Sequence, residues 1–327
     1  MEGAVIISDS QGRGHYFAKG IYNYLEGKEK RDFPLSMADI ERTEFADGEY
    51  KLKITENVRR KACFIIQDPN KESTRWFTDL VFTLEAMRFS SPSEINVVFP
   101  YLRFSRQDRK DESRVGVSSK AVADVTSWYA DRGMTCDLHA PQIQEYFSIP
   151  FDNLYSSLFL IDHLQARHPK FLENLTVVTP DQGGGKRAES LLKRMWGRGI
   201  DAEMAIGYKG RGEGGEVEVL KIMGDVKGRN CLLVDDIIDS GTTLIKAKNG
   251  LKKAGARAVA AYGTHGFFTK GMSGFKGFHS VMTGDTLCRP NQDVEVVSLT
   301  NLFGEAVYRT IMGDSLSGLF RDPEKKN

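Results

Sequence analysis

Short apolar segments alternate with longer amphipathic ones over most of the chain, and this alternation restricts the possible folds. Seven apolar segments have the length and composition of strands: 4–8, 62–67, 95–101, 134–139, 175–180, 231–236 and 258–265. Four segments between them have helical patterning: 73–89, 117–130, 186–196 and 242–254. Unbroken apolar strands separated by helices indicate parallel sheets with helices on both faces. We therefore expect an α/β fold.

Residues 41–54 depart from this pattern. Polar and apolar residues alternate there on both sides of Asp47-Gly48. An Asp-Gly pair between two alternating segments is typical of a tight hairpin turn. We expect an antiparallel hairpin with its tip at these two residues.

Two parts of the chain repeat one layout. Residues 117–140 and 241–266 each contain a pair of hydroxyl residues, a helical segment, a turn with glycine, and a strand that ends in histidine. Two copies of one sheet-and-helix domain account for this echo. We place the N-terminal domain at 1–150 and the C-terminal domain at 151–300. The tail 301–320 has a helical pattern and is expected to pack back on one of the two domains, with the N-terminal domain as our assignment.

Bulk properties exclude several classes of partner. The chain has 327 residues, a net charge of +1 and a sequence pI near 7.7, so no overall basic field favours nucleic acid. No apolar run approaches the roughly 20 residues that span a bilayer. The first ten residues lack the pattern of a secretory signal. We expect a cytoplasmic protein with no membrane partner.

The four cysteines are far apart and have no paired metal-ligand spacing. They are Cys63, Cys136, Cys231 and Cys288, and three of them lie within apolar strand-like segments. Such positions favour buried, reduced thiols over disulfides or a structural zinc site.

The segment CLLVDDIIDSGTT (231–243) carries the strongest functional signal. It runs from an apolar strand into Asp235, Asp236 and Asp239 and then into a Ser-Gly-Thr-Thr turn that opens a helix. Loops at the carboxyl ends of parallel strands face the crevice where α/β proteins bind ligands. The turn consists of Ser240, Gly241, Thr242 and Thr243, whose N–H groups and hydroxyls suit a phosphate group. Adjacent carboxylates suit the vicinal hydroxyls of a sugar.

A structural interpretation of the same segment is that Asp239 or Ser240 caps the helix while the other acids are solvated. Capping accounts for one residue, but not for two adjacent acids after Val234. The segment therefore favours a phosphosugar site.

VDDIIDSGTT also resembles the phosphoribosyl pyrophosphate motif of type I phosphoribosyltransferases. Five other segments resemble, in the same order, ribose-phosphate diphosphokinase (phosphoribosyl pyrophosphate synthetase): FADGEY (45–50), ENVRRKACFIIQ (56–67), RQDRKDESR (106–114), DLHAPQIQEYFSIPFDNLY (137–155) and TPDQGGGKRA (179–188). The resemblance implies two type I phosphoribosyltransferase-like domains, of which the second carries the ribose 5-phosphate loop. It agrees with the internal echo.

The resemblance implies transfer of the β,γ-pyrophosphoryl group of ATP to the C1 hydroxyl of ribose 5-phosphate, which releases AMP. Both substrates are anionic, so we expect Mg²⁺ and mobile cationic side chains to neutralise charge. By resemblance, His139 ligates Mg²⁺ or contacts the triphosphate, and Asp181 ligates the other Mg²⁺. Read alone, His139 fits a satisfied core histidine, and DQGGG (181–185) fits an ordinary turn.

The glycine-rich segment 207–219 lies where the family has a mobile catalytic loop. The loop carries a lysine and, two residues later, an arginine, which Lys209 and Arg211 match. Its five glycines suggest a segment too flexible for regular structure. The alternative to a catalytic loop is that 207–219 is a disordered linker.

On the ATP side, the resemblance assigns two groups of residues. Arg106, Gln107 and Asp108 hold the nucleotide, and Phe45, Asp47 and Glu49 shape its adenine end. The hairpin that carries the second group reaches a neighbouring subunit in the family, so we expect a homo-oligomer, a dimer at least and a hexamer by resemblance.

Several alternatives remain open from the sequence. The chain could transfer pyrophosphate to a different 5-phosphoribosyl acceptor. It could be a phosphoribosyltransferase that consumes the activated sugar, or a non-catalytic regulatory subunit. The presence of His139, Asp181, Lys209 and Arg211 favours the diphosphokinase. The sequence contains no Walker-type Gly-Lys-Thr loop, which excludes an ordinary P-loop kinase.

Overall fold

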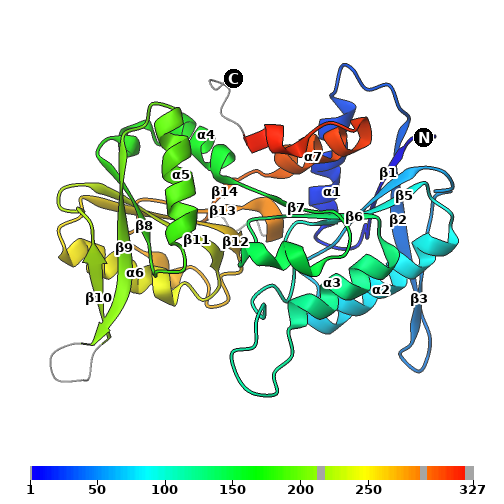
Figure 1. Cartoon of the computed structure of the whole chain (residues 1–327), viewed down its shortest axis with the longest axis horizontal. Coiled ribbons are helices and arrows are strands. Elements are labelled where there is room, and N and C mark those ends of the chain that lie inside the picture. Colours follow the sequence, from blue (N-terminus) through cyan, green and yellow to red (C-terminus); the bar gives the residue numbers. More distant parts are fainter. Residues whose placement is uncertain (1, 212–217, 288–292, 321–327) are drawn as a thin grey trace. The chain divides into compact units, whose positions relative to one another are not determined.

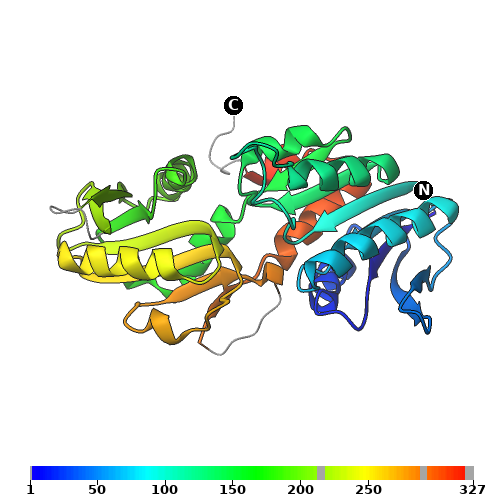
Figure 2. The ribbon, with the colours of Figure 1, turned by 90° about the horizontal axis from the view of Figure 1, so that it is seen from below.

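The computed structural model describes residues 2–211, 218–287 and 293–320. The chain divides into two compact units, which are described separately. Among the described residues, the first unit comprises the chain up to Tyr155 together with residues 286–287 and Leu299–Leu319. The second comprises Ser156–Asp285 and residues 293–298. Figures 1 and 2 show that each unit consists of a central sheet with helices on both faces.

The first unit contains a seven-stranded sheet in the order β3-β2-β1-β4-β5-β6-β7. Its strands are β1 (Ala4–Ser8), β2 (Leu35–Glu44), β3 (Tyr50–Ile54), β4 (Ala62–Ile66), β5 (Glu94–Phe99), β6 (Arg132–Cys136) and β7 (Phe151–Leu154). All neighbours are parallel except β2 and β3, which form the expected antiparallel hairpin. Because β7 pairs with β6, the first unit extends beyond Pro150, where the sequence placed the boundary.

Helices cover both faces of this sheet. They are α1 (His15–Glu26), α2 (Ser73–Phe89), α3 (Ser118–Tyr129), the 3₁₀ helix η1 (Pro141–Tyr146) and, from the end of the chain, α7 (Thr300–Met312) and the 3₁₀ helix η5 (Leu316–Phe320). Residues of α2, α3 and η1 share one apolar core with β1, β4 and β5. On α1, the ring of Phe17 meets Phe303 of α7 edge-on at 5.1 Å, and Tyr24 donates to Glu305 of α7 at 2.7 Å. The tail therefore packs on the first unit.

The second unit repeats the same topology. Its sheet has the order β10-β9-β8-β11-β12-β13-β14, again with one antiparallel pair, β9 and β10. The strands are β8 (Leu175–Thr179), β9 (Ala202–Arg211), β10 (Glu218–Met223), β11 (Asn230–Ile238), β12 (Ala258–Gly266), β13 (Val281–Gly284) and β14 (Glu295–Val297). The helices are α4 (Ser157–Arg167), α5 (Gly185–Gly197), α6 (Thr242–Lys253) and the 3₁₀ helices η2 (Pro169–Leu172), η3 (Ser273–Phe275) and η4 (Asp285–Leu287). The expected α/β class with two similar, mainly parallel sheets is confirmed.

The internal echo in the sequence aligned segments that are not equivalent in the fold. It matched α3–β6 with α6–β12, but the strand orders pair α6–β12 with α2–β5. The register supports this pairing, because Cys63 pairs with Val5 as Cys231 pairs with Thr176. The inference of a duplicated domain is confirmed by the two equal strand orders. The sequence similarity between 117–140 and 241–266 arises because both belong to β–α–β units, and not because they are equivalent in the two domains.

Three of the cysteines are buried free thiols, as expected: Cys63, Cys136 and Cys231. Burial raises the pKa of the Cys63 thiol to about 12 and that of Cys231 to about 11, so both stay protonated at neutral pH. Cys288 lies outside the described residues. Across the described part of the chain, the structure contains no helix that is long and apolar enough to cross a membrane.

Candidate functional site

Asp235 and Asp236 lie in β11, just beyond the end of its neighbour β8. The pairing of β11 with β8 ends at Leu233, while its pairing with β12 continues to Ile238. The strand is therefore longer than the sequence suggested. The two aspartates lie at the carboxyl edge of the sheet, where parallel α/β proteins bind their ligands.

Arg187, in the first turn of α5, holds this carboxylate pair. Its Nη1 donates to Oδ1 of Asp236 at 3.0 Å and lies 3.7 Å from Oδ1 of Asp235. The side chain of Asp236 is almost fully buried, whereas that of Asp235 is about one quarter exposed. Arg187 was not among the predicted site residues, although TPDQGGGKRA contains it. The signal that could have identified it is the need of two adjacent buried acids for a cation.

The two carboxylates repel each other. Burial raises the pKa of Asp235, and the adjacent carboxylate of Asp236 raises it further, to about 8, against the opposing effect of Arg187. A ligand that donates hydrogen bonds or brings positive charge to this pair relieves the repulsion. Sugar hydroxyls can donate in this way.

The turn after β11 leads into α6, and Gly241, the residue before the helix, has φ 74°. A Cβ on Gly241 would lie only 2.2 Å from the ring of Phe275, so the position requires glycine for two reasons. Gly241 carries no capping side chain, but Ser240 Oγ accepts a hydrogen bond from the backbone N–H of Thr242 at 3.4 Å. Ser240 therefore caps the first turn weakly, as the structural interpretation proposed for one residue, and capping leaves Asp235 and Asp236 unexplained.

The remaining residues of this turn are arranged differently. Thr242 and Thr243 are exposed, and the hydroxyls of Ser240 and Thr242 are 3.0 Å apart. Asp239 accepts a hydrogen bond from the hydroxyl of Thr269 at 2.8 Å, and its carbonyl accepts one from the backbone N–H of Thr269. Asp239 thus ties the turn to the segment after β12, while Thr242 and Thr243 face solvent at the helix N-terminus.

Asp181 lies in the turn that follows β8, next to β11 in the sheet. Its side chain is exposed, and its Oδ1 accepts a hydrogen bond from Gly184 N at 3.2 Å. Because β8 and β11 are adjacent and parallel, Asp181 shares the carboxyl edge with Asp235 and Asp236. An exposed carboxylate beside other oxygen ligands is compatible with Mg²⁺.

Lys209 and Arg211 belong to a strand, which corrects the expectation of a segment without regular structure. In β9, Lys209 pairs with Leu220 and Arg211 with Glu218 of β10. An antiparallel ladder bonds through the backbone, so glycines weaken it without preventing it. The middle of the predicted loop, 212–217, lies outside the described residues.

This β9–β10 arm extends from the same edge as the aspartates. The pairing of β9 with β8 ends at Ile206, and the strand continues to Arg211. At about 3.3 Å per residue, the backbone of Lys209 lies roughly 10 Å beyond that last pair. The topology therefore places both cationic residues on an arm beside the carboxyl edge.

In the first unit, Arg106, Gln107 and Asp108 follow β5, and Asp108 contacts the segment after β6. Asp108 Oδ2 accepts from Gln142 Nε2 at 3.2 Å, and its carbonyl oxygen accepts from Tyr146 Oη at 2.5 Å. Gln107 holds its own loop, since its carbonyl oxygen accepts from Ser119 Oγ at 3.0 Å. Arg106 is exposed.

His139 lies in the segment that follows β6. The sequence extended its strand to 139, but β6 ends at Cys136, and Asp137 then adopts a left-handed φ of 43°. The side chain of His139 is exposed, which excludes the core-histidine interpretation. The structure therefore brings the segments of 106–108 and 139 together at the carboxyl edge of the first sheet.

Phe45, Asp47 and Glu49 occupy the tip of the β2–β3 hairpin and are all exposed, with Phe45 50% exposed. The hairpin projects, because the pairing of β2 with β1 ends at Asp39 while its pairing with β3 continues to Glu44 (Figure 1). Asp47 also has a structural role that was not predicted, because its Oδ1 accepts a hydrogen bond from Glu49 N at 3.0 Å. In the strand order, this hairpin and the β9–β10 arm are equivalent elements.

The first unit does not bring this tip to Arg106–Asp108. Strands β2 and β5 are separated by β1 and β4, so three spacings of about 4.8 Å lie between them. Two groups of predicted residues therefore occupy different parts of one sheet edge.

Comparisons with known proteins agree with the division of the chain into two units. Residues 10–128 match the N-terminal domain of ribose phosphate pyrophosphokinase, and residues 152–267 match the phosphoribosyl transferase domain. The chain is 40% identical over 314 residues to a ribose-phosphate pyrophosphokinase of Agrobacterium fabrum, covering 93% of this chain and 96% of the relative. A relative of the same name from Chlorobaculum tepidum is 39% identical over 295 residues, covering 87% and 88%.

A solved structure extends the agreement to three dimensions. The crystal structure of phosphoribosylpyrophosphate synthetase from Mycobacterium smegmatis matches with a TM-score of 0.82 at 25% sequence identity, covering 95% of this chain and 99% of that chain. Family models, full-length relatives and fold thus agree with the resemblance in the sequence. The chain belongs to the ribose-phosphate pyrophosphokinase family.

Proposed function

We propose that the protein transfers the β,γ-pyrophosphoryl group of ATP to the C1 hydroxyl of ribose 5-phosphate, forming 5-phosphoribosyl 1-pyrophosphate and AMP. The observation that carries this proposal is near-full-length similarity to curated ribose-phosphate pyrophosphokinases. In the reaction, the C1 hydroxyl releases its proton to the medium and its oxygen forms a bond to the β-phosphorus. The bond from that phosphorus to the α,β-bridging oxygen breaks, and AMP leaves with its electron pair.

The second unit provides the residues for the sugar phosphate. The 5-phosphate binds at the N-terminus of α6, through N–H groups of its first turn and the hydroxyls of the exposed Thr242 and Thr243. Ser240 completes the turn. Asp235 and Asp236 accept hydrogen bonds from ring hydroxyls, and Arg187 donates to Asp236 and orients its carboxylate. Asp239 keeps the turn attached to the segment after β12.

The first unit provides residues for ATP. Arg106 offers a guanidinium group to the phosphates, and Asp108 and Gln107 hold the loop that positions it. Phe45 offers a ring to stack on adenine, with Asp47 and Glu49 as hydrogen-bond acceptors. Since a single first unit keeps the hairpin tip away from Arg106, the tip serves the nucleotide site of a second copy of the chain. The protein then acts as a homo-oligomer, a dimer at least and a hexamer by family resemblance.

Magnesium fits the available ligands. Asp181 offers an exposed carboxylate, and its neighbourhood is rich in oxygen atoms, which Mg²⁺ prefers. His139 offers an exposed imidazole near the nucleotide residues of the first unit. Bound Mg²⁺ would neutralise charge on the transferring group. Lys209 and Arg211 add positive charge from the β9–β10 arm, and closure of the arm would limit hydrolysis of ATP.

The test is an assay with purified protein, ATP, Mg²⁺ and either ribose 5-phosphate or a larger 5-phosphoribosyl compound. With ribose 5-phosphate, AMP should appear in a 1:1 ratio with 5-phosphoribosyl 1-pyrophosphate, and EDTA should stop the reaction. Turnover of only the larger acceptor would contradict the assigned substrate. Absence of any AMP in the presence of folded, oligomeric protein would support a regulatory subunit instead.

A further inference from the structure

Three of the six histidines in the chain gather at one place in the second unit. His163 is on α4, His168 directly follows this helix, and His279 precedes β13. They surround Glu295, the first residue of the edge strand β14. Because β13 and β14 run parallel to β11, this cluster lies at the amino edge of the sheet, opposite the edge that carries Asp235 and Asp236.

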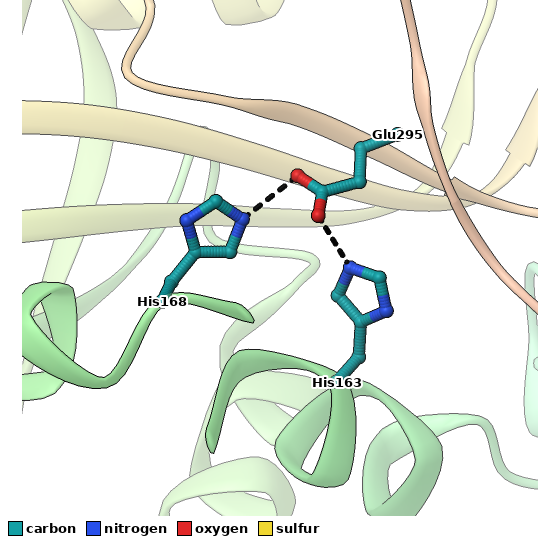
Figure 3. Close-up of side chains that lie close together, drawn as sticks. All are labelled: His163, His168 and Glu295. Atoms are coloured by element: carbon teal, nitrogen blue, oxygen red, sulfur yellow. Dashed lines mark hydrogen bonds and ion pairs between the residues drawn. The ribbon is translucent and has the colours of Figure 1, made fainter. Parts of the chain in front are cut away.

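Figure 3 shows that His163 and His168 approach the two oxygens of one carboxylate. His163 Nε2 is 2.8 Å from Glu295 Oε1, and His168 Nε2 is 2.7 Å from Oε2. The three potential ligand atoms, one from each residue, lie within 4.8 Å of one another. The side chains are 16%, 18% and 22% exposed, so they are held in place while solvent can reach them.

Neighbouring groups hold these side chains in position. Ser280 Oγ donates to Glu295 Oε2 at 2.6 Å, which fixes the carboxylate. The ring of His279 packs edge-on against His168 with centroids 5.4 Å apart, and it stacks on Phe171 at 4.8 Å. Supporting contacts of this kind orient the ligands of protein metal sites.

A cationic side chain also lies beside Glu295. The Nε of Arg167 is 3.8 Å from Glu295 Oε1, and the Arg167 side chain is 69% exposed and can turn outward.

The chemistry of these ligands selects a class of metal. Two imidazoles and one carboxylate form a ligand set that Zn²⁺ uses in tetrahedral sites with one open position. Mg²⁺ prefers oxygen ligands, so this site would discriminate against it. Metal–ligand distances of about 2.0–2.2 Å separate adjacent tetrahedral ligands by about 3.3 Å. The three ligand atoms lie within 4.8 Å of one another, so they would close by at most about 1.5 Å through side-chain rotation when a metal binds.

We propose that His163, His168 and Glu295 form a binding site for one divalent transition-metal ion of the zinc class, which cross-links α4 to the edge strand β14. The site is independent of the Mg²⁺ of the proposed reaction and of the substrates. Its role is to stabilise the second unit, because β14 is a short strand at the edge of the described sheet and pairs there with β13.

The test uses full-length protein freed of metal by chelation and titrated with Co²⁺ and Zn²⁺ in excess Mg²⁺ and without substrates. We expect one equivalent per chain, the visible absorption bands of tetrahedral Co²⁺, and a Zn²⁺-dependent increase in Tm. His163→Ala and Glu295→Gln should abolish all three. Ser280→Ala should weaken the affinity by about 10–100-fold, as loss of a supporting hydrogen bond does at other metal sites. His15→Asn, in the first unit, is the matched control and should bind as the unchanged protein does.

Two results would overturn the proposal. One is equal Zn²⁺ affinity in the unchanged protein and in both ligand variants. The other is a Tm that falls in these variants but never responds to metal, which would make the cluster a hydrogen-bonded clamp only. If the variants do not fold, X-ray absorption on the unchanged protein with Zn²⁺ decides. Two imidazole ligands and oxygen support the site, whereas sulfur ligands or oxygen alone contradict it.

Discussion

Arg187 donates from Nη1 to Oδ1 of Asp236 at 3.0 Å, and this ion pair joins the first turn of α5 to the end of β11. It connects the glycine-rich turn of Asp181 with the two carboxylates that we assign to the sugar. The pair places a guanidinium group against a nearly buried aspartate that lies beside a second acid. It also makes Arg187 a positioning residue for the proposed reaction.

Arg187→Ala should therefore raise the KM for ribose 5-phosphate at least tenfold, while the KM for ATP changes far less. It should also lower the Tm, because Asp236 loses a charged hydrogen bond worth about 1.5–3 kcal/mol. Arg187→Lys keeps the charge but not the planar donor, and should recover only part of the loss. Lys186→Ala, at the exposed adjacent position, is the control. Equal effects of both alanine variants would remove the assigned role.

The stability of the substrate-free protein should depend on pH through Asp235. Its pKa is raised on folding to about 8, so the folded state binds more protons than the unfolded state between about pH 4 and 8. Stability should therefore fall as pH rises through this window. Asp235→Asn should flatten the dependence and raise the Tm near pH 8, measured by thermal unfolding, with the exposed Asp181→Asn as control. A pH dependence that persists unchanged in Asp235→Asn would contradict this account.

Lys209→Ala and Arg211→Ala should lower kcat by about 10²–10⁴-fold, because we assign both residues to charge that develops in the transition state. Substrate affinities, measured by equilibrium binding, should change far less. Lys221→Ala is the matched control, since Lys221 lies on β10 of the same arm, opposite Tyr208. If the control and the two variants have similar activity, the arm is structural only.

Two inactive variants should complement each other if the β2–β3 hairpin serves a neighbouring chain. Glu49→Ala and Lys209→Ala, mixed, dissociated and reassembled, should recover part of the activity, because some sites combine an intact tip with an intact arm. A mixture of Lys209→Ala and Arg211→Ala should not recover, since both changes affect the same arm. A fully active monomer by light scattering under assay conditions would contradict the exchange.

The sequence could predict those parts of the fold that local patterns determine. The helix α2 matches its expected range 73–89, and β1 matches 4–8, because caps and apolar runs define their ends. The tip at Asp47-Gly48 also follows from local turn chemistry, with Gly48 at φ 89°. By contrast, β9 and β10 were missed because their ladder is made by backbone atoms between glycines, which leave no side-chain pattern.

The candidate site was predictable to a similar degree. The aspartates and the turn at 240–243 follow one another in the sequence, so a single segment identified them. Arg187 contacts Asp236 across 49 positions, and no local pattern encodes such a contact. The same limit applies to the cluster of His163, His168 and Glu295, whose members come from two distant segments that only the sheet brings together.

The most direct test of the proposed reaction is the fate of a phosphorus label in the β-position of ATP. The protein is incubated with this ATP, Mg²⁺ and ribose 5-phosphate, and the products are separated by ion exchange. Pyrophosphoryl transfer predicts that all of the consumed label enters the sugar product and that unlabelled AMP is the nucleotide released. Label that remains in ADP, with only the γ-phosphate on the sugar, would contradict the account.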